Sequence, residues 1–340
     1  MNGIFVLLAV AVAFAVTALL GKKVIPFLHK LKYGQTILDI GPAWHKKKQG
    51  TPTMGGVLFI IGCFLAIIIC VPLYTVFAVN HELITLESVR VYAGLVMALA
   101  YGLIGFFDDY IKVVQKRNQG LTARQKLLLQ ILVGGLYLFS LYLAGADGST
   151  IIPFFGTVNL GLLYWPIALF IIVGTVNSVN LTDGIDGLAS SVTFFAAIVL
   201  MIAASMMGKI GLSIAGAALG GACLGFLVWN FHPAKVFMGD TGSLFLGGMV
   251  CMLAFGLNMP VLLILVGIVY MMETLSDIIQ ILYFKATKGK RIFKMAPIHH
   301  HFEMSGWSEV KIVVVFSIIT MIGGVLALLC VYLGVLGINV

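Results

Sequence analysis

The sequence predicts an all-α membrane protein of about ten transmembrane helices. Of its 340 residues, 61% are hydrophobic and 10% are charged, whereas an average soluble domain carries roughly 25% charged residues. The apolar residues gather in runs of about 20, the length that a helix needs to cross the hydrocarbon core of a bilayer. No long polar segment interrupts these runs. We therefore expect residues 1–340 to form one integral-membrane domain.

Ten apolar runs are long enough to span a membrane. No lysine or arginine precedes the first run, whereas Lys22 and Lys23 follow it. This order is opposite to that of a secretory leader, so the first run is predicted to be a membrane span. The runs begin near Ile4, Met54, Val91, Leu127, Leu162, Leu188, Gly211, Ser243, Val261 and Ile312.

Positive charge is distributed unevenly over the predicted loops. Of the 21 Lys and Arg residues, only Arg90 and Lys209 lie on the side of the membrane that would carry both termini. Cytoplasmic loops carry the excess of lysine and arginine in membrane proteins, which places the charged loops in the cytosol and both termini outside. The net charge of +8 then indicates topology and affinity for anionic lipid or substrate, and no nucleic-acid partner is expected.

Acidic residues stand at the predicted cytosolic ends of several spans. Three segments combine them with glycines or amides, and these are Phe107-Asp-Asp-Tyr-Ile-Lys112, Asn177-Ser-Val-Asn-Leu-Thr-Asp-Gly-Ile-Asp-Gly-Leu188 and Phe237-Met-Gly-Asp-Thr-Gly-Ser243. A charged side chain near the bilayer centre costs at least ~2.5 kcal/mol on insertion scales, so such acids are functional candidates. The three segments are predicted to form one site on the cytosolic face.

Asp108 and Asp109 are expected to have different roles. Adjacent residues point about 100° apart on a helix, whereas Lys112 lies one turn beyond Asp108 on the same side. Paired aspartates could instead cap a following helix, but the apolar run continues through them. The sequence therefore favours a functional interpretation of both acids.

In the central segment, Asn180, Asp183 and Asp186 recur every three residues. This spacing could place one amide and two carboxylates on a common face, and the intervening glycines allow the backbone to approach a ligand closely. Helix capping is the structural alternative. Capping would account for one of these residues, but not for all of them together with Asn177.

Asp240 is a further aspartate whose surroundings suit a metal ion. It is followed by a glycine and by hydroxyl side chains, and Mg²⁺ is usually held by one or two carboxylates together with substrate phosphates. Phe237 lies three residues earlier. Packing in the core and stacking on a planar base are both compatible with its position.

The first and last charged loops carry candidates for phosphate binding. Lys46–Lys48 precede Gly50-Thr-Pro-Thr-Met-Gly-Gly56, which is predicted to open a helix with free N–H groups suited to an anion. One of these lysines would contact a phosphate or a base, unless the run is only a solvated basic surface. In the last loop, His299, His300 and His301 are expected to contact phosphate rather than zinc, because consecutive residues cannot easily ligate one ion.

These segments together resemble the polyprenyl-phosphate N-acetylhexosamine-1-phosphate transferase superfamily. The similarity runs nearly end to end and rests on Thr51-Pro-Thr-Met-Gly-Gly56, Phe107-Asp-Asp-Tyr-Ile-Lys112, Asn180-Leu-Thr-Asp-Gly-Ile-Asp-Gly187, Phe237-Met-Gly-Asp240 and Pro297-Ile-His-His-His-Phe-Glu303. The aspartate motifs are shared across the superfamily. The histidine loop is the feature that resembles the bacterial phospho-N-acetylmuramoyl-pentapeptide transferase family.

That resemblance implies a ten-helix enzyme of the bacterial inner membrane, usually a homodimer, with its active site facing the cytosol. It would transfer phospho-MurNAc-pentapeptide from UDP-MurNAc-pentapeptide to undecaprenyl phosphate, giving lipid I and UMP, with Mg²⁺ as the cofactor. Such phosphoryl transfer depends mainly on positioning and on neutralising charge with metal and cationic groups. The basic residues and Mg²⁺ would therefore be required by the mechanism.

The resemblance also implies a role for each matched residue. Asp240 would bind Mg²⁺, and the acids nearest the lipid phosphate would be Asp108 and Asp109. The diphosphate or uridine side of the nucleotide would be contacted by Asn180, Asp183 and Asp186. The uridine pocket would be lined by Lys48, Asn230 and Phe237, with Phe237 stacking on uracil. The polar cleft would be completed by His299, Gln280 and Lys112. The same substrate site is expected to include Asn177, His300 and His301.

Two alternatives remain open at the level of sequence. A transporter would show polar residues at the membrane midplane within broken helices and an internal repeat. No repeat is evident, although Glu273 and Asp277 lie one turn apart inside a predicted span. Another UDP-sugar transferase of the same superfamily is distinguished only by the final loop.

Overall fold

The computed structural model describes residues 2–30, 48–78, 86–115 and 119–337. Within these residues, nine helices are long and apolar enough to cross a membrane, and a bent pair of helices supplies a tenth span. The nine are α1 (Asn2–Lys30), α2 (Gly56–Ala78), α3 (Leu86–Val114), α4 (Ala123–Leu143), α5 (Tyr164–Thr182), α6 (Leu188–Met206), α7 (Ile210–Asn230), α8 (Gly239–Gly256) and α12 (Glu309–Val331). The prediction of an all-α membrane fold is confirmed.

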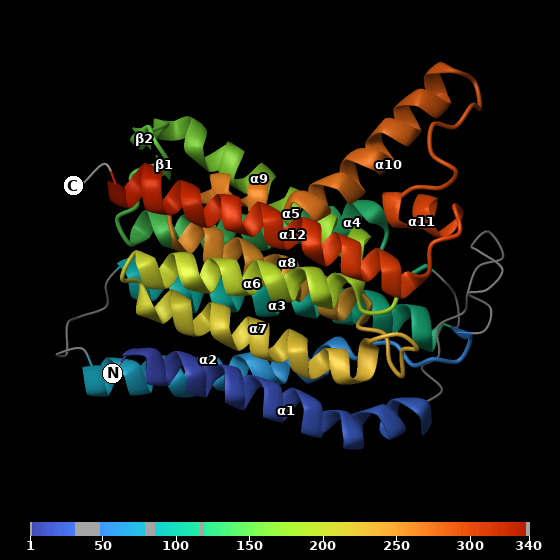
Figure 1. Cartoon of the computed structure of the whole chain (residues 1–340), viewed down its shortest axis with the longest axis horizontal. Coiled ribbons are helices and arrows are strands. Elements are labelled where there is room, and N and C mark those ends of the chain that lie inside the picture. Colours follow the sequence, from blue (N-terminus) through green and yellow to red (C-terminus); the bar gives the residue numbers. More distant parts are fainter. Residues whose placement is uncertain (1, 31–47, 79–85, 116–118, 338–340) are drawn as a thin grey trace.

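Helices α7 and α8 form the centre of the bundle, since 89% of the residues in the most apolar stretch of each are buried. Helix α3 packs along α8, while α1 and α6 pack along α7 (Figure 1). Small residues permit the close approach of α3 and α8. A Cβ atom added to Gly105 would collide with the backbone of Asp240, and one added to Gly248 would lie 2.7 Å from the Cα of Ala98. Helices in membranes commonly meet through such residues.

The tenth predicted span, beginning near Val261, is not one straight helix. A 3₁₀ turn, η3 (Pro260–Leu262), and the short α9 (Leu263–Val266) are bent by 80° from α10 (Ile268–Ala286). Gly267 stands at the bend, where a side chain would meet the carbonyl of Leu263. Helix α10 therefore leaves the bundle at an angle, and the chain returns through α11 (Ile298–Glu303) (Figure 1).

The connection between α4 and α5 contains a small antiparallel hairpin that the sequence did not predict. It consists of β1 (Ser149–Ile152) and β2 (Gly156–Asn159), with Ser149 opposite Asn159. The turn η2 (Gly161–Leu163) follows. The hairpin is tied to the end of α8, because the Ile151 N–H and the Thr150 hydroxyl both donate to the carbonyl of Asn258.

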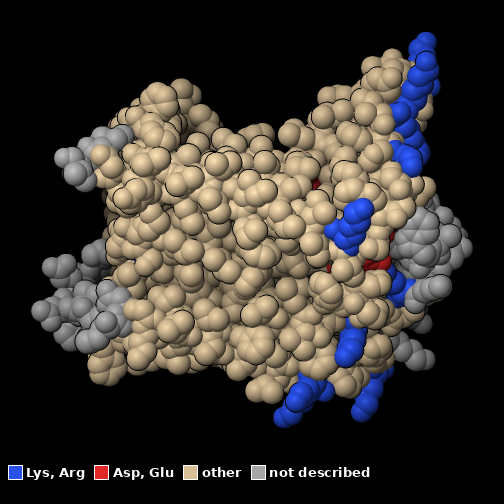
Figure 2. Space-filling view, viewed as in Figure 1, with Lys and Arg blue, Asp and Glu red and all other residues tan. Residues whose placement is uncertain are grey.

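The two ends of the bundle differ in charge. Helix α1 begins, and the terminal π-helical turn η4 (Tyr332–Leu336) ends, at the end that carries the hairpin (Figure 1). On the face shown in Figure 2, the lysines and arginines gather toward the opposite end and along the tip of α10. The broad middle of that face carries few charges, as a surface in contact with lipid requires.

The contact between α3 and α8 predicts a specific sensitivity to side-chain volume. Gly105→Ala should lower the melting temperature in detergent, because overpacking a close contact typically costs about 1 to 3 kcal/mol. Gly135→Ala on α4 is the matched control, since no atom lies within 4 Å of the position that its Cβ would take. The control should be neutral or slightly stabilising. Equal melting temperatures for the two variants would show that the α3–α8 contact is not tight.

Candidate active site at the charged end of the bundle

Asp240 lies at the centre of a polar cluster at the first turn of α8. Its Oδ2 accepts hydrogen bonds from Lys112 Nζ at 3.1 Å and from Lys126 Nζ at 2.8 Å. Its Oδ1 accepts one from Asn180 Nδ2 at 2.9 Å. Helices α3, α4, α5 and α8 thus converge on one carboxylate. The structure brings together the predicted residues Asp240, Lys112 and Asn180, and adds Lys126 to them.

Asp108 and Asp109 have different surroundings, as expected for neighbours on a helix. Both oxygens of the buried Asp109 accept hydrogen bonds at the start of α8, from the N–H groups of Asp240 and Thr241 and from the Thr241 hydroxyl. Asp108 accepts from the N–H of Leu121 and pairs with Lys112 at 2.6 Å. Capping is therefore part of the role of Asp109, although the helix that it caps is α8 and not the one that follows it.

The glycine before Asp240 is required by this arrangement. Gly239 has a φ of +69°, a left-handed conformation that glycine adopts without steric cost. A side chain there would also collide with the carboxylate of Asp109 and approach the hydroxyl of Thr53 to 2.7 Å. The Gly-Asp pair thus lets α8 begin directly against the carboxylate of α3.

Carboxylates outnumber cations in this cluster. Ligand oxygens of Asp108, Asp109 and Asp240 all lie within 4.8 Å of one another. Asp183, just beyond α5, is close enough to interact with them electrostatically; its burial and the negative charge of neighbouring carboxylates raise its pKa well above the usual value. Against four acids stand the two ammonium groups of Lys112 and Lys126. With all four acids ionised, the cluster is two positive charges short of neutrality.

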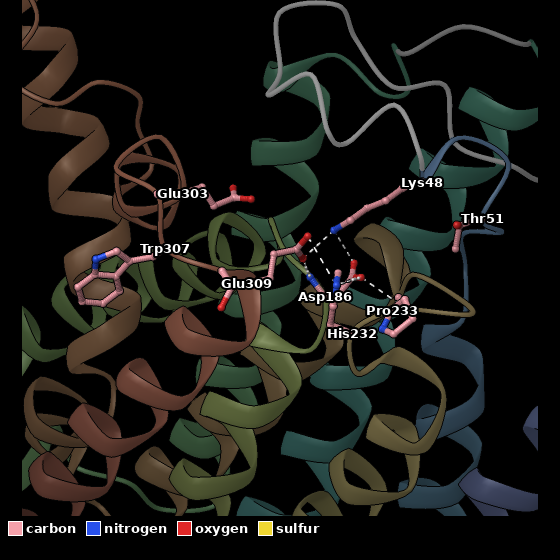
Figure 3. A pocket seen from close by; sticks show the side chains of 11 residues that line it. Lys48, Thr51, Asp186, His232, Pro233, Glu303, Trp307 and Glu309 are labelled. Carbon is pink, nitrogen blue, oxygen red and sulfur yellow. Dashed lines mark hydrogen bonds and ion pairs between the residues drawn. The ribbon is translucent and has the colours of Figure 1, made fainter.

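A second cluster lies beside the first and lines a cavity of about 670 Å³ (Figure 3). Lys48 Nζ lies 2.8 Å from Asp186 and 2.7 Å from Glu309. His232 Nδ1 lies 3.0 Å from the other oxygen of Asp186. Lys48 and Thr51 stand on one side of the cavity, with Glu303 and Trp307 on the other.

Oxygen and nitrogen atoms of Asp186, His232 and Glu309 also lie within 4.8 Å of one another. Here, however, the ammonium group of Lys48 already lies between the two carboxylates. A metal ion would have to displace that cation or be repelled by it. Lys112 likewise lies between Asp108 and Asp240 in the first cluster, but that cluster offers three carboxylates, whereas this one offers two carboxylates and an imidazole. Because Mg²⁺ prefers hard oxygen ligands, the cluster around Asp240 is the better divalent-cation site.

The central segment does not present its polar residues on one face, so that expectation was wrong. Helix α5 ends at Thr182, and Gly187, with a φ of +78°, turns the chain into α6. As a result, Asn180 bonds to Asp240 in the first cluster, whereas Asp186 bonds to Lys48 in the second. Asp183 lies between the two residues in sequence, at the end of the helix.

Asn177 lies one helical turn before Asn180 and belongs to a contact between helices. Its Nδ2 donates to Oε1 of Gln130 on α4 at 2.7 Å, and Gln130 is only 1% exposed. Asn177 Nδ2 also donates to the carbonyl of Val173. The structure thus gives Asn177 a partner within the bundle, separate from the acidic cluster.

Asn230 is buried and supports the backbone around it. It is 2% exposed, and its Oδ1 accepts from the N–H of Gly187 and the hydroxyl of Ser190. Its Nδ2 donates to the carbonyl of Val236. The side chain predicted to line a uridine pocket therefore fastens the Gly187 turn to the segment that precedes α8.

Phe237 is half-buried, and its backbone joins the loop before α2. Its N–H donates to the carbonyl of Pro52, and its carbonyl accepts from the N–H of Gly55. The N–H of Gly56 donates to the carbonyl of Met238. The prediction that this turn offers free N–H groups to an anion was wrong for Gly55 and Gly56. Lys46 and Lys47 lie outside the described residues.

The three consecutive histidines have different partners. His299 is fully buried and bonds through Nδ1 to Oε2 of Glu273 at 2.9 Å. His300 Nδ1 lies 2.6 Å from Glu303, and His301 Nδ1 accepts from the N–H of Lys294 at 3.1 Å. The three rings are thus directed to separate partners, and their contact with phosphate stays a prediction.

Gln280 supports the loop that follows α10. Its Oε1 accepts from the N–H groups of Ile292 and Phe293, and its Nε2 donates to the carbonyl of Phe293. These bonds use both ends of the amide. The structure therefore places Gln280 in the support of the histidine loop and gives it no bond to the acidic cluster.

Sequence reasoning missed Lys126, His232 and Glu309. Lys126 is one of many cations on the positively charged side of the sequence, and Glu309 lies in the first turn of α12, where an acid also favours the helix. Thr122 caps α4 together with Gln125, and Lys126 lies one helical turn after Thr122. This spacing is the only signal that could have placed Lys126 on a fixed face of the helix near the membrane surface.

Two family models match parts of this region, and curated relatives match most of the chain. The profile of Glycosyl transferase family 4 matches residues 91–258, and signature 1 of the phospho-N-acetylmuramoyl-pentapeptide-transferases matches residues 48–60. The phospho-N-acetylmuramoyl-pentapeptide-transferase of Clostridium perfringens (strain SM101) is 48% identical over 93% of this chain and 94% of its own. Those of Desulforamulus reducens and Clostridioides difficile (strain 630) are 48% and 44% identical, over 95% and 94% of this chain and 94% and 96% of their own.

The pairing of Asn177 with Gln130 predicts that the two side chains depend on each other. Asn177→Ala and Gln130→Ala should each lower the melting temperature, because hydrogen bonds between membrane helices contribute roughly 0.6 to 2 kcal/mol. The melting temperature of the double variant should be no lower than that of the less stable single variant. Thermal unfolding of all four proteins in one detergent measures this coupling. Strictly additive losses would mean that Asn177 acts elsewhere.

Proposed function

Because this chain belongs to the phospho-N-acetylmuramoyl-pentapeptide-transferase family, we propose that the cluster around Asp240 is the active site at which it makes lipid I. An oxygen of undecaprenyl phosphate attacks the β-phosphorus of UDP-MurNAc-pentapeptide. The bond from that phosphorus to the bridging oxygen breaks, and UMP leaves. The observation that carries this assignment is the convergence of Asp108, Asp109 and Asp240 on two lysines.

The donor atoms of this cluster fit Mg²⁺. They are hard carboxylate oxygens close enough to share one ion, and Mg²⁺ is usually bound by one or two carboxylates plus substrate phosphates. Asp240 and Asp108 would hold the ion by exchanging the mobile ammonium group of Lys112, which lies between them, whereas Asp109 is bonded to backbone N–H groups at the first turn of α8. When bound, Mg²⁺ would supply the two positive charges that four ionised acids and two lysines lack.

The lysines bring the remaining positive charge to the transferred group. Lys112 and Lys126 reach Asp240 from α3 and α4, so their ammonium groups lie where phosphate oxygens would approach a metal held by Asp240. Phosphoryl transfer relies on such positioning and charge neutralisation. Asn180 holds Asp240 from the opposite side through its amide. Together these three side chains hold the carboxylate of Asp240, the proposed metal ligand, in position.

The cavity beside the cluster is suited to the nucleotide. It is lined by Lys48 and Asp186, which would contact the uridine side. Asp183 lies in sequence between Asp186 and Asn180, which bonds Asp240. Phe237 is half-buried on the segment that leads into α8 and would stack on uracil. Asn230 contributes indirectly by holding the Gly187 turn. His300 and His301 would border the substrate through the histidine loop.

The enzyme lies in the bacterial inner membrane with many spans. We place the active site on the cytosolic face because it occupies the end of the bundle at which lysines and arginines gather (Figure 2). A soluble nucleotide would then enter from the cytosol and the lipid phosphate from the bilayer. The family resemblance also implies a homodimer, which cross-linking in native membranes would test.

Transfer should require both a lipid acceptor and a divalent cation. UMP release from UDP-MurNAc-pentapeptide is expected only when undecaprenyl phosphate and Mg²⁺ are both present, because the charges of two phosphate groups must be neutralised as they meet. EDTA should abolish the release and added Mg²⁺ should restore it. Replacing the donor with UDP-GlcNAc is the control for donor identity. Turnover that persists after complete chelation would remove the metal from the mechanism.

Direct transfer and a covalent route make different predictions for isotope exchange. A phosphate monoester has its second pKa near 6, so the lipid phosphate is largely a dianion at neutral pH and can attack without a strong base. Asp108 or Asp109 would then orient it. Labelled UMP should not exchange into UDP-MurNAc-pentapeptide in delipidated protein, and Asp240→Asn should be nearly inactive at any Mg²⁺ concentration. Lipid-free exchange as fast as turnover would instead make one of these aspartates a nucleophile.

A further inference from the structure

Glu273 is a buried acid that the proposed reaction does not use. It lies on α10, close to the bend at Gly267, and is 0% exposed. Its Oε2 lies 2.9 Å from Nδ1 of His299 and 3.4 Å from the His299 backbone N–H. His299 is itself 0% exposed. A carboxylate removed from water and bonded to one imidazole is costly to maintain, which indicates a specific use.

The far side of the imidazole is unsatisfied. Within the described residues, Nε2 of His299 and Oε1 of Glu273 are buried and have no hydrogen-bond partner. An unpaired buried polar atom costs about 1 to 3 kcal/mol, and such atoms in native structures commonly mark a catalytic or ligand-binding role. Glu273 and His299 therefore make one hydrogen bond with each other, and Nε2 of His299 is left without a partner among the described residues.

The free nitrogen is directed at the central segment. A Cβ atom added to Gly184 would collide with Nε2 and Cε1 of His299. Gly184 is itself exposed and follows Asp183, whose carboxylate interacts electrostatically with Asp240 and Asp186. The imidazole thus faces the part of the chain that connects the acidic cluster with the nucleotide cavity.

We propose that Glu273 is a positioning residue for His299, which it holds with Nδ1 protonated so that Nε2 is directed at a phosphate oxygen of the nucleotide beside Gly184. This inference rests on the proposed function, because the ligand is the diphosphate of the sugar nucleotide. With Nδ1 donating to the carboxylate, a proton on Nε2 would be donated to the phosphate oxygen as a charge-assisted hydrogen bond. No proton is transferred in this step.

A neutral amide at position 273 would lose this effect while keeping the shape of the side chain. Glutamine can donate to Nδ1 as well as accept from it, so it does not impose one tautomer. It also carries no charge to balance an imidazolium. Carboxylates that orient a functional histidine are worth roughly 10- to 100-fold where they have been measured around metal sites. Glu273→Gln is expected to show a loss in this range.

The competing explanation is that Glu273 only fastens α11 to α10. A double-mutant cycle separates the two, because a residue that acts through His299 has no effect once His299 is absent. Glu273→Gln, His299→Ala and the double variant are compared with wild type in UMP release, together with melting temperatures. Thr274→Val is the matched control, since Thr274 is the next residue on α10 and its hydroxyl bonds Ser178 on α5 at 2.7 Å.

Glu273→Gln should lower kcat/KM for UDP-MurNAc-pentapeptide by roughly 10- to 100-fold, with the KM for undecaprenyl phosphate unchanged. The double variant should be no slower than His299→Ala alone, and Thr274→Val should stay within twofold of wild type. The idea is overturned if Glu273→Gln remains fully active, or if the losses of Glu273→Gln and His299→Ala multiply in the double variant.

A spectroscopic measurement tests the same bond without turnover. In protein labelled with ¹⁵N-histidine, the signals of His299 are identified by their loss in His299→Ala. They should report a protonated Nδ1 in wild type and shift in Glu273→Gln, but not in Thr274→Val. Failure of wild type to release UMP would refute the proposed function and leave this readout interpretable. If the signals of His299 do not change in Glu273→Gln, the positioning role itself is refuted.

Discussion

The structure depends on keeping several carboxylates together at the edge of a low-dielectric medium. Like charges this close repel strongly unless hydrogen bonds and cations compensate them. Here the first turn of α8 satisfies Asp109, while Lys112 and Lys126 compensate Asp240. Each of these groups comes from a different helix or from the start of one. The acidic site and the packing of the helices therefore depend on each other, because the groups that compensate the acids come from different helices.

This dependence explains why the most closely packed helices also carry the site. Helix α8 brings Asp240, and α3 brings the two neighbouring aspartates, and glycines permit their contact. A site built on such helices is held more accurately than one built on loops. The cavity proposed for the nucleotide, by contrast, is formed largely by segments that connect helices. It is thus the part of the site in which exchange of substrate and product is easiest to accommodate.

Much of this arrangement could be predicted from the sequence, since apolar runs define spans and acids at their ends must have a use. Asp108, Asp109 and Asp240 were expected in one site, and the structure brings them together. The partners of polar residues were harder to predict, because a partner is set by tertiary contacts. Gln280 and Asn230 proved to hold backbone groups. Asn180 and Asp186 diverged because α5 ends between them, and periodicity alone cannot show such an end.

The contact between His299 and Gly184 has a consequence for how the two segments can vary. The glycine is exposed, and the three atoms nearest to a Cβ added there all belong to the ring of His299. Its identity is dictated by a ring that enters from a loop far along the sequence. The absence of a side chain at Gly184 leaves the space that the imidazole of His299 occupies. A substitution in either segment that alters this contact must be matched by a substitution in the other, so the aspartate segment and the histidine loop must change together.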